Sequence, residues 1–238
     1  MKSKKHNDLQ EAILETPCGI IRELAPPNLL SDHATRFMIR HLSVKKGAKT
    51  ADVGCGSGVL AIFMALAGAV SVVGIDTNTD SIETARDNAT LNNVKNVEFM
   101  EGSLLEPVDG PIDLIAALLP HKPAPCPIDR RYYGGEDGTD LIIPIIEQAR
   151  CKLAPEGILY LYLNGIANQK KIHKYFNAGF ETEMIAQKKR YFTQEEFDLL
   201  TEGMFKYIMD LRMQGISEVF EDVTGLYFMS RIWRGTLR

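Results

Sequence analysis

The stretch ADVGCGSGVL, residues 51–60, gives the strongest indication of how this chain of 238 residues folds. Its three glycines, Gly54, Gly56 and Gly58, fall within five positions, after an apolar start and before a long apolar run. Glycine is costly inside strands and helices, so its repeated use here indicates a backbone that must turn sharply or be approached closely. We therefore expect a strand that ends in a ligand-binding turn, followed by a helix.

Strands and helices are predicted to alternate from this turn onward. The helix after it, residues 58–68, is apolar on every side, which is typical of a helix buried against a sheet. Further strands are expected at 70–76, 96–103, 112–119 and 157–165, separated by helices at 80–93, 140–154 and 168–180. This alternation predicts an α/β fold with a doubly wound, mostly parallel sheet and helices on both faces.

The N-terminal part departs from this alternation. Residues 1–15 and 31–42 are predicted to be helices, the second with Ser31 as its N-cap. We therefore expect residues 1–46 to form a helical lead-in to a domain that spans residues 47–238.

The C-terminal part departs from it as well. Two more strands, 181–192 and 225–235, bring the expected sheet to seven strands. A helical insert is predicted between them, at 194–217. Its apolar residues recur at helical spacing, so most of them are expected to face the core, and the remainder could serve as a lid or a dimer contact.

Composition and charge restrict the possible partners. The chain has 45% hydrophobic and 24% charged residues, as an ordinary soluble globular protein does. A net charge of −4 argues against nucleic acid as the main partner, because nucleic-acid-binding domains usually carry a basic face. No apolar run approaches the ~20 residues of a membrane span, and the first residues lack the apolar core of a secretory signal. We expect a cytoplasmic protein without a membrane partner.

The cysteines point the same way. Cys18, Cys55, Cys126 and Cys151 are scattered without a C-x-x-C pair, which fits neither a zinc site nor a disulfide framework. Reduced thiols in the cytoplasm are the simpler interpretation. No cluster of His, Asp and Glu has the spacing of metal ligands, so no metal is assigned.

An acidic residue completes the predicted ligand site. Asp76 ends the second strand of the alternation, 22 residues after Gly54, and a carboxylate there can accept both hydroxyls of a ribose. The dinucleotide fingerprint G-x-G-x-x-G is not met in its usual form, and the predicted helix carries Leu60 two residues after Gly58. Asp52 before the first glycine would suit an ammonium or sulfonium better than a pyrophosphate. These features together favour S-adenosylmethionine as the ligand.

The stretches ADVGCGSGVLAI and VVGIDTNTDSIETARDNATLNNV resemble the class I S-adenosylmethionine-dependent methyltransferases, over about residues 49–165. The resemblance implies an enzyme with the Rossmann-like fold of that superfamily. It implies that the glycines line the methionine part of the donor, that Asp76 holds the ribose and that Gly102 and Ser103 lie beside the adenine. The predicted cofactor-binding residues are Asp52, Gly54, Cys55, Gly56, Gly58, Asp76, Thr77, Gly102, Ser103 and Leu118.

Two subfamilies are similar to different parts of the chain. Residues 132–161, beginning YYGGEDG, resemble the release-factor glutamine methyltransferases and their short relatives. The GCGSGVLAI and GAVSVVGIDTNTDSI stretches resemble the ribosomal-protein lysine methyltransferases as much. Amino-methylating members end the fourth strand with Asn-Pro-Pro-Tyr, whereas this chain has Leu118, Leu119, Pro120 and His121 at that place.

The catalytic residues are predicted from that altered strand end. Methyl transfer from a sulfonium is an in-line displacement, so the protein mainly positions the acceptor and removes a proton. His121, with an ordinary pKa of about 6.5, is predicted to be the general base, and the alternative is a loop histidine that faces water. Tyr132 and Tyr133 are predicted to wall the acceptor pocket.

We expect an S-adenosylmethionine-dependent methyltransferase that acts on a small molecule or on a protein or peptide group. A protein glutamine or lysine methyltransferase is the alternative within the class. A cofactor-binding scaffold of the same fold that has lost catalysis is the alternative from another class. The oligomeric state stays open, and a dimer is possible.

Overall fold

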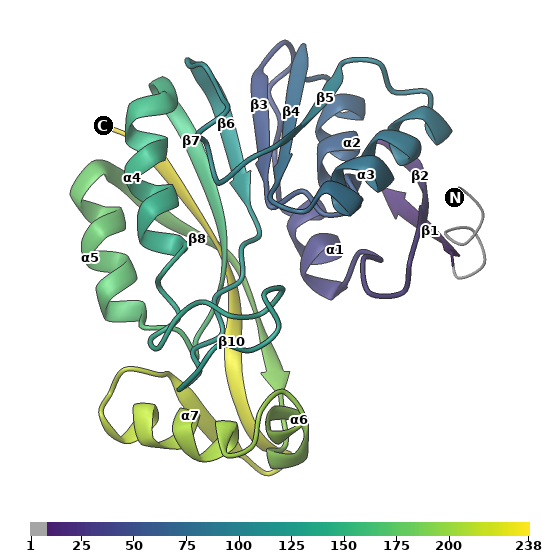
Figure 1. The fold of residues 1–238 in the computed structure, drawn as a ribbon. Coiled ribbons are helices and arrows are strands. Elements are labelled where there is room, and N and C mark those ends of the chain that lie inside the picture. Colours follow the sequence, from purple (N-terminus) through teal and green to yellow (C-terminus); the bar gives the residue numbers. More distant parts are fainter. Residues whose placement is uncertain (1–8) are drawn as a thin grey trace. The chain divides into compact units, whose positions relative to one another are not determined.

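The structure is a computed structural model that describes residues 9–238 (Figure 1). The chain divides into two compact units, the first with residues up to 118 and 152–158, the second with 119–151 and 159–238. Within the described residues, no helix is long and apolar enough to cross a membrane.

The first unit contains a parallel sheet in the order β5-β4-β3-β6. Val53 of β3 lies opposite Ile75 of β4 and Ala117 of β6, and Asp76 of β4 lies opposite Glu101 of β5, so these strands end at one edge. Its parallel strands are β3 (Lys49–Val53), β4 (Ser71–Asp76), β5 (Val97–Glu101) and β6 (Ile112–Ala117), and its helices are α1 (His33–Ile39), α2 (Val59–Leu66) and α3 (Thr79–Leu91).

The second unit continues the strand order with β7-β10-β8, and β7 contributes residues to both units. Strands β10 and β8 pair antiparallel from Tyr227 to Leu237 of β10, and the short β9 also pairs with β10. The strands are β7 (Leu153–Asn164), β8 (Phe180–Tyr191), β9 (Val219–Asp222) and β10 (Gly225–Leu237), and the helices are α4 (Ile142–Lys152), α5 (Gln169–Gly179), α6 (Gln194–Asp198) and α7 (Met204–Met213). The order β5-β4-β3-β6-β7-β10-β8 confirms the predicted mostly parallel α/β fold. Because the short β9 pairs with β10, the sheet has eight strands, one more than the seven predicted.

The prediction of an N-terminal helix over residues 1–15 is wrong for its described part. Residues 10–25 form an antiparallel hairpin of β1 (Gln10–Thr16) and β2 (Gly19–Ala25). Thr16 makes the turn, because its hydroxyl accepts the Cys18 N–H and donates to the Gly19 carbonyl. Residues 1–8 lie outside the described residues. The period of two in β2, where alternate residues are buried, is the signal for a strand.

The predicted N-cap of the next helix is also wrong. Asp32, not Ser31, caps α1, with its carboxylate accepting the N–H groups of Ala34 and Thr35. Ser31 instead donates both its N–H and its hydroxyl to the carboxylate of Glu23 in β2. The serine therefore connects α1 to the hairpin.

The insert at 194–217 consists of two helices rather than one, and they lie at one end of the β8–β10 ribbon (Figure 1). Gly203 adopts φ +75° and precedes α7, and Asp198 at the end of α6 accepts the Phe205 N–H. Most of the apolar stripe faces the core as expected. Phe197, Met204 and Ile208 are buried in a cluster with Phe192 and Phe228.

Gly74 of β4 generates a prediction about the core of the first unit. A Cβ at this position would lie 2.4 Å from Cδ1 of Phe99, its neighbour on β5. Gly74→Ala should therefore lower the free energy of unfolding by about 1–3 kcal/mol, the usual cost of overpacking. Urea unfolding measures this loss. Adding Phe99→Leu should recover part of it, and losses that simply add in the double variant would contradict the contact.

Candidate functional site

The three glycines of the β3–α2 turn all hold left-handed backbone, with φ of +78° at Gly54, +52° at Gly56 and +82° at Gly58. Gly58 serves packing, since a Cβ there would lie 2.8 Å from Cβ of Ala85 in α3. Gly56 leaves the backbone open to a ligand, since a Cβ there would meet nothing within 4 Å. The turn therefore presents open backbone to a ligand while the start of α2 lies tightly against α3.

Asp76 lies at the end of β4, beside this turn. Its Oδ2 accepts the Gly56 N–H at 3.0 Å, and its Oδ1 accepts the Asn78 N–H at 2.9 Å. Each carboxylate oxygen can accept a second hydrogen bond, so the side chain can still receive two neighbouring hydroxyls. This geometry fits the predicted contact with a ribose.

Asp52, on β3, is buried with 1% of its surface exposed. Burial is the main reason why the pKa of Asp52 is raised to about 7. A hydrogen bond from the Ala61 main-chain N–H, at the start of α2, lowers the pKa, and the negative charge of Asp76 raises it further. Among residues 9–238 its Oδ2 has no hydrogen-bond partner. Two carboxylates next to open backbone fit a cationic ligand, since a positive charge there would favour their ionised forms.

The other predicted cofactor residues also belong to the first unit. Cys55 is buried, and burial raises the pKa of its thiol well above the usual value, so it is no candidate nucleophile. Gly102 donates its N–H to the Asp76 carbonyl, and a Cβ there would lie 2.7 Å from Cγ of Pro107. Thr77 is exposed, and Ser103 and Leu118 are half-buried.

His121, Tyr132 and Tyr133 belong to the second unit. His121 is 5% exposed and edge-on to the ring of Tyr162. Its Nδ1 donates to the Leu119 carbonyl at 2.6 Å, and its Nε2 accepts the Asn164 N–H at 2.9 Å. Burial lowers its pKa to about 4. Both ring nitrogens are thus occupied, which argues against the predicted general-base role and against a histidine that faces water.

Tyr132 and Tyr133 lie half-buried in a loop that main-chain hydrogen bonds fix in place. Lys122 donates its N–H to the Tyr132 carbonyl at 2.8 Å and accepts the Gly134 N–H at 2.9 Å. The Lys122 ammonium lies 4.3 Å from the centre of the Tyr132 ring. Tyr207 of α7 donates its hydroxyl to the Glu136 carbonyl, so the helical insert also supports this loop.

Two glycines after the tyrosines pack against the main chain of His121. A Cβ on Gly134 would lie 2.4 Å from the His121 Cα, and a Cβ on Gly138 would lie 2.6 Å from its carbonyl oxygen. The main chain of His121 therefore packs against the loop, and its side chain fixes His121 to Asn164 at the end of β7. Over the part of the chain described, no group of three or more His, Cys, Asp or Glu side chains is placed to hold a metal ion.

Three residues that support the glycine turn were not predicted from the sequence: Glu23, Ser57 and Asn88. Ser57 donates its hydroxyl to the buried carboxylate of Glu23, and Asn88 donates to the Ser57 carbonyl. Reading GIIRELA as a strand would have placed Glu23 on its buried face.

Comparisons with known proteins identify methyltransferases as relatives of this chain. Residues 29–194 match the methyltransferase small domain family. A putative protein N5-glutamine methyltransferase of Methanocaldococcus jannaschii is 29% identical over 178 residues, which are 72% of this chain and 90% of that protein. A ribosomal protein L11 methyltransferase of Clostridium botulinum is 40% identical over 85 residues, 35% of this chain and 27% of that protein.

A solved structure shares the fold. The 16S rRNA N2 G1207 methyltransferase of T. thermophilus, in complex with AdoMet and guanosine, has a TM-score of 0.62 and 14% identity. The match covers 97% of this chain and 51% of that one. At this identity the likeness concerns the fold alone.

The raised pKa of Asp52 predicts a pH dependence of the ligand-free protein. The unfolded state loses this proton near the ordinary pKa of 3.8, whereas the folded state keeps it up to about pH 7. The folded state therefore loses stability as the pH rises through that window. In Asp52→Asn this loss is absent.

We compare the free energy of unfolding of Asp52→Asn with that of the wild type at about pH 5 and at about pH 8. Relative to the wild type, the variant should gain about 3 kcal/mol between these two pH values. Urea unfolding at both pH values measures the difference, and any constant cost of the amide cancels. A difference that does not change with pH would mean that Asp52 is ionised throughout.

Proposed function

Since the chain belongs to the methyltransferase small domain family and is an S-adenosylmethionine-dependent methyltransferase, we propose that its acceptor is a side-chain nitrogen of a protein, of the glutamine or lysine type. The relative named as a protein N5-glutamine methyltransferase supports this, because the match extends over 72% of this chain and 90% of that protein. The named L11 methyltransferase matches a shorter stretch and also carries a protein substrate in its name.

The first unit would hold the donor. The open backbone at Gly56 and the carboxylate of Asp76, which retains acceptor capacity, support a nucleoside site at the end of β3 and β4. The orphaned oxygen of Asp52 supports a ligand that carries positive charge. S-adenosylmethionine supplies an already activated methyl group on a sulfonium, so these residues need only bind and orient it.

The observation that carries the mechanism is the engagement of both nitrogens of His121. A ring with no free lone pair and a pKa of about 4 cannot take a proton from the acceptor near neutral pH. We therefore assign His121 to positioning, as the support of the loop that carries Tyr132 and Tyr133. In this proposal the acceptor nitrogen attacks the methyl carbon, the sulfur–carbon bond breaks, and the nitrogen's proton passes to solvent.

We also propose a cellular compartment and a domain boundary for the chain. The four cysteines are free thiols, which supports a reducing, cytoplasmic compartment. The boundary at residues 46 and 47 is proposed as the start of the methyltransferase domain proper.

The acceptor is tested by incubating the full chain and methyl-labelled S-adenosylmethionine with cell extract, then separating protein, RNA and small molecules. We expect label in protein, on a nitrogen that amino-acid analysis identifies. Asp76→Ala is the control, because loss of charge-assisted hydrogen bonds to the ribose should cost about 2–3 kcal/mol of donor binding and abolish labelling. Label only in RNA or only in small molecules would overturn the proposed acceptor, and no label with donor bound would indicate a non-catalytic protein.

His121→Asn tests the positioning role. The depressed pKa means that the histidine stabilises the fold above about pH 6.5 and loses this contribution as the pH falls towards about 4, in total about 3 kcal/mol. The variant should lack this loss on acidification in urea unfolding. Its activity per folded molecule should show the same pH profile as the wild type between about pH 6 and 8. A wild-type inflection near pH 6.5 that disappears in the variant would restore the general-base role.

A further inference from the structure

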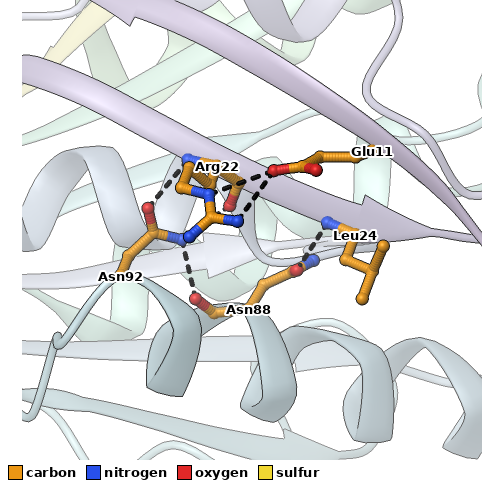
Figure 2. Close-up of polar contacts among 5 residues, drawn as sticks. All are labelled: Glu11, Arg22, Leu24, Asn88 and Asn92. Atoms are coloured by element: carbon orange, nitrogen blue, oxygen red, sulfur yellow. Dashed lines mark hydrogen bonds and ion pairs between the residues drawn. The ribbon is translucent and has the colours of Figure 1, made fainter.

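The hairpin of β1 and β2 is attached to α3 by two asparagine side chains (Figure 2). Asn92 accepts the Arg22 N–H at 2.8 Å and donates to the Arg22 carbonyl at 2.6 Å. Asn88, one turn earlier, accepts the Leu24 N–H at 2.8 Å. The two amides at i and i+4 face the same edge of β2 and take the place of a third strand.

Glu23, between Arg22 and Leu24, connects the hairpin to the glycine turn. Its side chain is fully buried. The carboxylate accepts the Ser57 hydroxyl at 2.6 Å, the Ser31 N–H at 2.7 Å and the Ser31 hydroxyl at 2.6 Å. Ser57 lies in the turn, between Gly56 and Gly58. The hairpin thus holds a residue of the donor site directly.

Ser57 is held at a second atom as well. The side-chain N–H of Asn88 donates to the Ser57 carbonyl at 3.0 Å. The oxygen of the same amide accepts the Leu24 N–H of the hairpin. On the other side of the turn, Gly56 donates its N–H to Asp76. Hydrogen bonds on the two sides of the turn, joined by the peptide bond between Gly56 and Ser57, therefore connect the hairpin to the carboxylate that would bind the ribose.

A buried carboxylate is a costly means of attaching a hairpin, since an apolar side chain of similar volume would pack there without the desolvation penalty. Unlike an apolar side chain, Glu23 makes a directional hydrogen bond with the Ser57 hydroxyl. This bond fixes the conformation of a turn that consists largely of left-handed glycines. We propose that Glu23 and Asn88 are positioning residues for the methyl donor, and that docking of the hairpin and binding of the donor are thermodynamically coupled. The proposal rests on the donor site assigned above.

Coupling is reciprocal, so it has two readouts. If the docked hairpin fixes the turn in its binding conformation, a bound donor must in turn strengthen docking of the hairpin. If the hairpin only stabilises the fold, its variants would lower the unfolding temperature but would change neither the donor affinity nor the effect of the donor on docking of the hairpin.

The first experiment measures S-adenosylmethionine affinity by calorimetry in the full-length chain. Ser57→Ala and Glu23→Gln should each weaken binding by about tenfold, because the turn loses a charge-assisted hydrogen bond. Ser57→Thr, which keeps the hydroxyl, should recover most of the affinity. The matched control is Glu11→Gln, which removes the exposed ion pair with Arg22 on the same hairpin. This control should bind the donor as the wild type does.

The second experiment follows hydrogen exchange of residues 10–25 with and without the donor. The wild type and Glu11→Gln should show slower exchange of the Leu24 amide when the donor is bound, and Ser57→Ala should lose most of this protection. Unchanged affinity and unchanged donor-dependent protection in folded Ser57→Ala would overturn the coupling while the donor site stands. A wild type that binds no donor would instead overturn the donor site, and the coupling with it.

Discussion

Left-handed backbone at Gly54, Gly56 and Gly58 bends the chain between β3 and α2. The hydrogen bonds that the turn and α2 donate to Asp76 and Asp52 depend on this bend. It brings the start of α2 against Ala85 of α3 and leaves Gly56 facing open space. The main-chain N–H of Gly56 then lies within reach of Asp76, and that of Ala61 within reach of Asp52. A side chain at Gly58 would separate α2 from α3 and move these donors away from the carboxylates they meet.

The parts of the fold that the sequence could predict are those in which the local pattern and the packing agree. The apolar helix after the turn and the alternation of strands and helices led directly to the parallel sheet. The hairpin at 10–25 was missed because its charged residues resemble those of a solvated helix, whereas Glu23 is buried through partners at Ser31 and Ser57 that are distant in sequence. A single long insert was predicted because Gly203 alone does not indicate where one helix ends and the next begins.

The residues of the candidate site differ in the same way in how far sequence alone describes their surroundings. Asp52, Asp76 and the glycines follow from strand ends, which are local features. The environment of His121 is not local, because its Nε2 is occupied by the main chain of Asn164, 43 residues away. Sequence alone assigns a histidine its ordinary pKa, whereas the structure shows that burial lowers the pKa of this one and that both of its ring nitrogens are hydrogen-bonded.

The pair of asparagines on α3 has a consequence for solubility. A β-strand with an unpaired edge offers a template on which another chain can add a strand, and proteins protect such edges in several ways. Here two amide side chains, one turn apart on a helix, occupy the main-chain groups of Arg22 and Leu24 that a foreign strand would need. The same contacts that attach the hairpin therefore also protect the β2 edge against the addition of a foreign strand.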